Sequence, residues 1–139
     1  MDNTYIFKEF EKLIKKSLKS GDVPVAAIIE KNGKIISKAY NNREKNNKII
    51  SHAEVNAILK ASKKLKNKFL FDCNMYVTLK PCSMCENIIK QSRIKNVYYV
   101  LDKPENKFEY SKTKIEKIDS NFEKKYVKIL QDFFNKIRQ

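Results

Sequence analysis

Two short segments of this sequence carry the side chains best suited to chemistry, and they read Ser51-His-Ala-Glu54 and Pro81-Cys-Ser-Met-Cys85. Cys82 and Cys85 lie three residues apart, which places both sulfurs on one face of a helix, and a helix N-terminus stabilises their thiolates. His52 is the only histidine of the chain, so it supplies one imidazole. One imidazole and two thiolates leave a fourth tetrahedral position for water, as in a catalytic zinc site. We therefore expect one Zn²⁺ held by His52, Cys82 and Cys85.

Glu54 lies two residues after His52, so the two side chains leave a helix in different directions. This spacing suits a carboxylate that reaches a metal-bound water better than one that binds the ion itself. Zinc lowers the pKa of its water toward neutrality, and Glu54 can take that proton and later deliver it. The order His-x-Glu followed by Pro-Cys-x-x-Cys is a known signature of zinc-dependent base deaminases. Together the two segments predict zinc-dependent hydrolytic deamination, with Glu54 as the catalytic proton shuttle and a zinc-activated water as the nucleophile.

Each segment alone also has a simpler interpretation. Ser51 and Glu54 fit a helix capping box, in which Glu54 would serve only the helix start. Cys82 and Cys85 fit a redox pair. The third cysteine, Cys73, just precedes an expected strand and is expected to be a small buried hydrophobe. As a fourth ligand it would instead close the zinc site.

Hydrophobic periodicity predicts the elements that position these residues. We expect helices over 5–19, 51–64 and 81–91, with Pro81 in the first turn of the third, and a last helix with an apolar face (Phe122, Tyr126, Ile129, Leu130, Phe133, Phe134, Ile137). Strands are expected over 25–29, 34–40, 74–79, 96–100 and 115–118, with a hairpin turn at Asn32-Gly33 and loops over 41–50 and 102–113. This alternation predicts an α/β fold, a three-layer α/β/α sandwich with a central mixed sheet of about five strands and helices on both faces. The length predicts a single domain over residues 1–139.

Composition and charge narrow the class of protein. No apolar run approaches the roughly 18–20 residues of a membrane span, and the first residues lack the apolar stretch of a secretory signal. We therefore expect a soluble cytoplasmic protein whose cysteines serve a metal or catalysis before disulfides. The formal net charge of +14 fits a nucleic-acid partner. It also fits a codon bias toward Lys, because 27 of the 30 basic residues are Lys and only three are Arg.

Five stretches resemble the bacterial tRNA-specific adenosine deaminases: Asp22–Ala27, Asn41–Glu44, His52–Ile58, Tyr76–Cys85 and Ser92–Ile94. The resemblance implies the cytidine-deaminase fold, a homodimer with one zinc per subunit and no organic cofactor. It also implies deamination of the wobble adenosine to inosine in a tRNA anticodon stem-loop. The family's zinc ligands match His52, Cys82 and Cys85, and its proton-shuttling glutamate matches Glu54. Its base-contacting asparagine matches Asn41, and Arg43 matches a position near the anticodon loop. Lys80 stands where the family usually has Glu.

Two other functions remain open from the sequence. The first is the same chemistry on a free nucleobase or nucleoside, of the guanine or cytosine type, which would need neither the 41–44 segment nor a basic surface. The second is a non-catalytic, zinc-stabilised RNA-binding protein, in which Cys73 would complete the ligand set. The presence of Glu54 favours an enzyme over this last function.

Overall fold

The computed structural model describes residues 3–43, 48, 50–102, 114–117 and 120–138. The chain divides into two compact units, Met1–Glu105 and Asn106–Gln139. The described residues of the first unit form these elements along the chain: α1 (Asn3–Lys19), β1 (Ala26–Lys31), β2 (Lys34–Tyr40), α3 (Ala53–Leu65), β3 (Cys73–Leu79), α4 (Ser83–Gln91) and β4 (Asn96–Leu101). The second unit contains α5 (Phe122–Ile137). Most of the expected loop over 102–113, and part of that over 41–50, lie outside the described residues.

The four strands of the first unit form one mixed sheet in the order β2-β1-β3-β4. β1 pairs antiparallel with both β2 and β3, whereas β3 and β4 run parallel and are joined through α4. The turn between β1 and β2 has positive φ at Asn32 (53°) and Gly33 (81°). These are the backbone angles that a tight two-residue hairpin requires, so the hairpin predicted from Asn32-Gly33 is confirmed.

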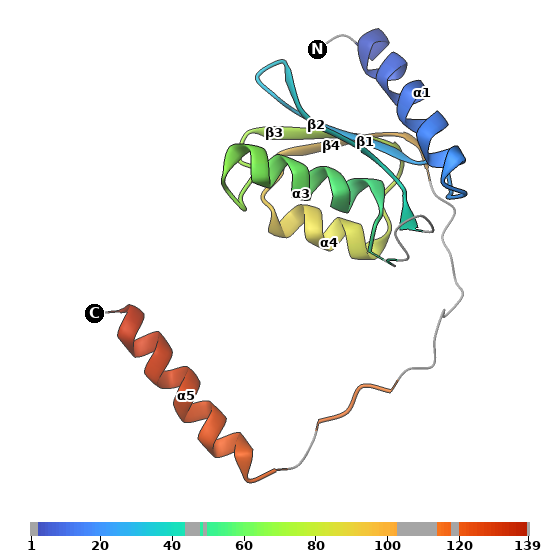
Figure 1. Ribbon diagram of the computed structural model, residues 1–139. Coiled ribbons are helices and arrows are strands. Elements are labelled where there is room, and N and C mark those ends of the chain that lie inside the picture. The colour runs from blue at the N-terminus through green and yellow to red at the C-terminus, as the bar shows by residue number, and fades with distance from the viewer. Residues whose placement is uncertain (1–2, 44–47, 49, 103–113, 118–119, 139) are drawn as a thin grey trace. The chain divides into compact units, whose positions relative to one another are not determined.

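Helices cover both faces of this sheet (Figure 1). On one face α1 packs through Ile6, Phe10 and Leu13 against Ala26 and Ile28 of β1. On the other face α3 and α4 pack against the alternate residues of the strands; this core includes Ala27, Ile29, Ala57, Ala61, Met75, Val77 and Ile89. Successive residues of β1 thus serve opposite cores, because side chains alternate across a strand. The predicted three-layer α/β/α arrangement is confirmed.

One expected strand and the start of one helix near the cysteines differ from the sequence-based expectation. The expected strand over 115–118 is absent from its described part, because 114–117 has no strand conformation. Ile115 is 96% exposed and is the only apolar residue among these four, so the segment has no apolar face to bury against a sheet. The helix expected from Pro81 begins at Ser83, with Cys82 as its N-cap, because the extended backbone of Cys82 (φ −69°, ψ 169°) precedes the first helical residue.

The described part of the second unit, taken by itself, contains one amphipathic helix, α5. No residue of α5 is buried, and Phe133 and Phe134 are 56% and 52% exposed. The expected apolar face of this helix is therefore exposed within the described part of its own unit, since a single helix offers nothing to pack against. None of the described helices is long and apolar enough to cross a membrane.

Candidate active site

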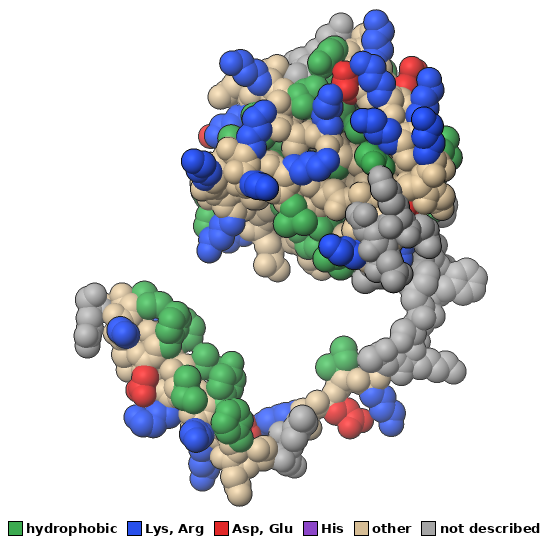
Figure 2. Space-filling model, viewed as in Figure 1, with side chains coloured by type: hydrophobic (Ala, Val, Ile, Leu, Met, Phe, Trp, Pro, Cys, Tyr) green, Lys and Arg blue, Asp and Glu red, His purple; other side chains and the backbone are tan. Residues whose placement is uncertain are grey.

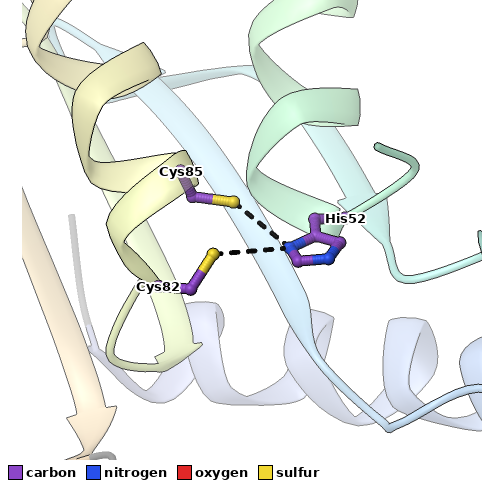
Figure 3. Close-up of side chains that lie close together, drawn as sticks. All are labelled: His52, Cys82 and Cys85. Atoms are coloured by element: carbon purple, nitrogen blue, oxygen red, sulfur yellow. Dashed lines mark hydrogen bonds between the residues drawn. The ribbon is translucent and has the colours of Figure 1, made fainter. Parts of the chain in front are cut away.

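His52 meets two cysteines from a later segment of the chain where two helices of the first unit begin. His52 is the N-cap of α3, Cys82 is the N-cap of α4, and Cys85 lies in the first turn of α4. The Nδ1 atom of His52 lies 3.3 Å from the sulfur of Cys85 and 3.8 Å from that of Cys82, and both sulfurs face the imidazole (Figure 3). The three potential ligand atoms all lie within 4.8 Å of one another. The structure thus brings together the three residues that the sequence singles out as metal ligands.

The spacing of these atoms fits a tetrahedral zinc ion. With Zn–N near 2.0–2.1 Å and Zn–S near 2.3 Å, two ligand atoms at a tetrahedral angle lie about 3.6 Å apart. The two nitrogen–sulfur distances of 3.3 and 3.8 Å lie on either side of that value. One nitrogen and two sulfurs are also donors that zinc prefers over magnesium or calcium, which bind oxygen. His52, Cys82 and Cys85 could therefore hold Zn²⁺ with one position left over.

Glu54 lies beside this cluster. It is 4% exposed, and its carboxylate is close enough to act on the thiol of Cys85. Burial, followed by the charges of Glu54 and Cys82, raises the pKa of Cys85 far above its ordinary value. A thiol in such a position keeps its proton unless a cation replaces that proton. The electrostatics of the site thus call for a positive charge among these residues.

The capping-box interpretation of Ser51 and Glu54 is wrong, because α3 starts one residue later. His52, not Ser51, is the N-cap, and its own side chain makes no capping hydrogen bond. The amide of Ala53, the first helical residue, instead donates to Oδ1 of Asn41 at 2.7 Å. The acceptor thus comes from twelve residues earlier in the chain, and the backbone N–H of Ser51 donates to the carbonyl of Lys48 at 3.2 Å.

Asn41 is held at three points of the first unit. Its backbone N–H donates to the carbonyl of Val25 at 3.0 Å, and its carbonyl accepts from the hydroxyl of Ser17 at 2.9 Å. Its side-chain oxygen accepts from Ala53. Asn41 is 7% exposed and lies directly after β2, so the predicted base-contacting residue is also the cap of the helix that carries His52 and Glu54.

Asn56 joins the same segments from the next turn of α3. Its side-chain nitrogen donates to the carbonyl of Tyr40 at 3.1 Å, to Oδ1 of Asn42 at 2.8 Å and to the carbonyl of Ser51 at 3.3 Å. Sequence reasoning missed both Ser17 and Asn56. The local signal at Ser17 is a small polar residue in register with the apolar residues Phe10 and Leu13 of α1, and Asn56 has no comparable signal.

Arg43 lies two residues after Asn41 and is half-buried. Its Nε atom is buried and has no hydrogen-bond partner among the described residues. Its backbone carbonyl accepts from the amide of Lys48 at 3.1 Å. A buried donor of this kind carries a desolvation penalty that a bound acceptor would relieve.

Cys73 lies apart from the metal cluster. It opens β3, is fully buried and belongs to the core between the sheet and α3. Burial raises the pKa of its thiol above the ordinary value, as expected for a cysteine among apolar side chains. Within the described part of the chain the metal-binding group contains His52, Cys82 and Cys85 without Cys73, and the prediction that Cys73 is a buried hydrophobe is confirmed.

Comparison with known families covers nearly the whole chain. The MafB19-like deaminase family matches residues 1–138. The chain belongs to this family. Curated relatives of this deaminase-family protein include the tRNA-specific adenosine deaminase of Aquifex aeolicus, which is 43% identical over 104 residues. That match covers 74% of this chain and 69% of the relative.

Two further relatives carry the same name. The tRNA-specific adenosine deaminase of Rickettsia bellii is 48% identical over 80 residues, and that of Bacillus subtilis is 40% identical over 98 residues. These matches cover 56% and 70% of this chain, and 55% and 60% of the relatives. The chain therefore matches somewhat more than half the length of these two proteins.

Two solved structures support the same fold. One belongs to a study of tRNA:A34 deaminases that perform A-to-I editing at the wobble position; it has 28% identity and a TM-score of 0.68, over 71% of this chain and 76% of that chain. The other, guanine deaminase from Bacillus subtilis, has 26% identity and a TM-score of 0.80 over 95% of each chain. The cytidine-deaminase-like fold expected from the resemblance is thereby confirmed.

Proposed function

We propose that this protein is a zinc-dependent tRNA adenosine deaminase that converts the wobble adenosine of an anticodon stem-loop to inosine. The observation that carries the proposal is the group of His52, Cys82 and Cys85 at two helix N-termini with the buried carboxylate of Glu54 beside it. The wobble specificity is supported by relatives that are named tRNA-specific adenosine deaminases at 40–48% identity.

In this proposal Nδ1 of His52 and the sulfurs of Cys82 and Cys85 hold one Zn²⁺ per subunit. Zinc in such a site supplies Lewis-acid activation of a water molecule at neutral pH. The cluster supports a catalytic rather than a structural site, because three described residues form it and Cys73 lies elsewhere in the core. The two helix N-termini add positive dipole ends that favour thiolates at Cys82 and Cys85.

Glu54 moves the protons of the reaction. Its carboxylate takes one proton from the attacking water and delivers it to N1 of adenine as the oxygen bonds to C6. It then passes the second proton of that water to the amino group, which leaves as ammonia. Adenosine and water thus become inosine and ammonia. A carboxylate that is 4% exposed suits both roles, because exclusion of water limits proton exchange with solvent.

Asn41 and Arg43 are the candidate substrate contacts. The side-chain oxygen of Asn41 already accepts from Ala53, so its Nδ2 atom supplies donors for an acceptor on the base. The buried Nε of Arg43, which has no partner in the described part of the chain, is a second candidate donor for an acceptor on the RNA. The wobble base lies in a loop and is unpaired, so its presentation to these groups requires less energy than flipping a base from a duplex.

The basic surface supports an RNA substrate in a general way. Figure 2 shows Lys and Arg side chains spread over the visible face of the first unit with few acidic ones between them. This diffuse distribution agrees with the net charge of +14 and with the 27 Lys among the 30 basic residues. A diffuse basic face attracts phosphate without selecting a site, so we propose that a minority of these lysines contact the tRNA.

A second candidate function is the deamination of free guanine. The specific observation in its favour is the likeness to the Bacillus subtilis guanine deaminase, which extends over 95% of both chains. The same metal group and the same glutamate would serve, since both reactions replace an amino group on a purine ring. The two candidates differ in substrate size and can be separated directly.

The test is to incubate the zinc-loaded protein with an anticodon stem-loop that has adenosine at the wobble position, with free adenosine and with guanine. Inosine is read by sequencing and ammonia is measured in parallel. We expect inosine at the wobble position of the stem-loop. Release of ammonia from guanine alone would favour the second candidate. RNA binding without ammonia from any substrate would favour a non-catalytic zinc protein.

Glu54→Gln is the decisive variant. We expect it to keep its zinc and to deaminate the stem-loop about 10²–10⁴-fold more slowly, the range for a general acid–base group. Glu86→Gln is the matched control, because Glu86 is an exposed residue of α4 that pairs with Lys90 at 3.2 Å. A Glu54→Gln variant that matches the control in rate would contradict the proposed role of Glu54.

We also propose that the protein acts as a homodimer in the cytoplasm, as the family resemblance implies. The edge strand β4 supports association, because Tyr98, Tyr99, Val100 and Leu101 are 45–63% exposed. Apolar strand edges of this kind are commonly covered by another segment or chain. Light scattering on the zinc-loaded protein should give twice the chain mass of 16.4 kDa; a monomer at micromolar concentration would contradict the dimer.

A further inference from the structure

Ser17 is a fully buried polar side chain that no proposed step uses. It lies near the C-terminal end of α1, on the opposite face of the sheet from α3 and α4. Its hydroxyl lies 2.9 Å from the carbonyl oxygen of Asn41 and 3.1 Å from that of Val23. A serine inside a helix usually bonds a carbonyl of its own preceding turn. The hydroxyl of Ser20 does so, with Ser17 at 2.8 Å, whereas that of Ser17 reaches a residue 24 positions away.

The acceptor of this bond is the residue that caps α3. The three hydrogen bonds of Asn41, to Ser17, Val25 and Ala53, anchor both its backbone and its side chain. The bond to Ala53 also sets the orientation of the amide, because a flipped amide would place its NH₂ group against the N–H of Ala53. Within the described residues Nδ2 therefore carries the donors that remain for a ligand.

We infer that Ser17 is a positioning residue that holds Asn41, and through it the N-terminus of α3, in the orientation that receives the base. The inference rests on the proposed function only in that Asn41 contacts the substrate. It adds a polar contact from α1 to the site, although α1 packs on the other face of the sheet (Figure 1). Without the hydroxyl, the carbonyl of Asn41 loses a buried hydrogen-bond donor. The backbone at Asn41 can then shift and move its side chain away from the amide of Ala53.

The test compares Ser17→Ala with Ser20→Ala, which removes the neighbouring hydroxyl that bonds the last turn of α1 from just beyond its end. We expect Ser17→Ala to lower kcat/KM for the anticodon stem-loop about tenfold, the effect of one net hydrogen bond of about 1.4 kcal/mol. Zinc content should stay the same, and Ser20→Ala should remain within about twofold of wild type. A Ser17→Ala variant with wild-type kcat/KM would overturn the inference.

A double-variant cycle separates positioning from a general loss of structure. Asn41→Asp keeps the oxygen that caps Ala53 and removes the Nδ2 donors. If Ser17 acts through those donors, Ser17→Ala lowers single-turnover rates little or not at all in the Asn41→Asp background. An equal tenfold loss in both backgrounds would mean that Ser17 supports the fold rather than Asn41.

A readout that needs no activity keeps the two proposals distinct. Amide hydrogen exchange at Ala53 should become about tenfold faster in Ser17→Ala and remain unchanged in Ser20→Ala. If the wild type deaminates guanine instead of the stem-loop, the proposed function fails, and the same variants are compared with guanine. Unchanged exchange at Ala53 would overturn the role of Ser17 whichever substrate is used.

Discussion

Asn41 offers the sharpest test, because one side chain has two separable tasks. Its oxygen caps α3 through the amide of Ala53 at 2.7 Å, and its nitrogen is proposed to contact the base. Asn41→Ala removes both groups. Asn41→Asp keeps an oxygen acceptor in the same place and removes the nitrogen donors. The pair of variants therefore separates stability from substrate recognition at one position.

The stability change follows from burial. Ala53 is fully buried and Asn41 is 7% exposed, so water does not readily replace the lost acceptor. A buried donor without a partner costs about 1–3 kcal/mol, and loss of a helix N-cap typically about 1 kcal/mol. These two costs describe largely the same lost hydrogen bond and are not added. We expect Asn41→Ala to lower the free energy of unfolding by about 2 kcal/mol. Asn41→Asp should change it by less than about 0.5 kcal/mol, because Asp caps as well as Asn and its charge suits a helix N-terminus.

Urea unfolding of the zinc-loaded variants measures the free energy of unfolding, with zinc content determined for each sample. The rate of deamination of the anticodon stem-loop measures substrate recognition, and both variants should lose most of this activity. Two results would refute the reasoning: Asn41→Ala as stable as wild type, or Asn41→Asp as unstable as Asn41→Ala. The first would mean that the amide of Ala53 finds another partner, and the second that the oxygen at position 41 is not the stabilising group.

Three further predictions follow from the same structure. Cys85→Ser should bind zinc far more weakly, and a chelator should abolish deamination by the wild type until zinc is restored; activity that survives metal removal would contradict the metal site. Glu9 is buried on α1 and accepts from Lys38 of β2 at 3.1 Å, and this hydrogen bond holds the pKa of Glu9 below its ordinary value of 4.5. Its stabilising effect is thus present above that pH and is lost as the pH falls through the lower folded-state value. Glu9→Gln should therefore be less stable than wild type at pH 7 and approach wild type in stability as the pH falls below the folded-state pKa of Glu9, whereas a stability difference that does not change with pH would point to packing instead. Lys80 precedes Pro81 and Cys82, makes a long, exposed ion pair with Asp102 at 3.9 Å and lies over the ring of Tyr99 at 6.0 Å from its centroid. Lys80→Ala should weaken stem-loop binding and reduce the slope of its salt dependence by about one, and an unchanged slope would place Lys80 off the RNA path.

Much of the fold could be predicted because its signals are local. The hairpin at Asn32-Gly33 depends on two adjacent residues that tolerate positive φ, and both have it. The amphipathic spacing of α1 identifies the face that packs on β1. The expected strand over 115–118 is absent from its described part because a strand depends on contacts that are not local. A strand there needs a partner that supplies its buried face, and 114–117 alone does not have enough apolar residues to require one.

The sequence by itself determined the chemistry of the site. A single histidine, two cysteines three residues apart and a glutamate two residues after the histidine supply the candidate metal donors and the proposed proton carrier, because side-chain chemistry and helix spacing are local properties. Only the tertiary structure decided how the site is held. Asn41 caps α3 across 12 residues and Ser17 reaches Asn41 across 24. Such contacts depend on which residues the sheet and its covering helices bring together, and no spacing along the chain encodes them.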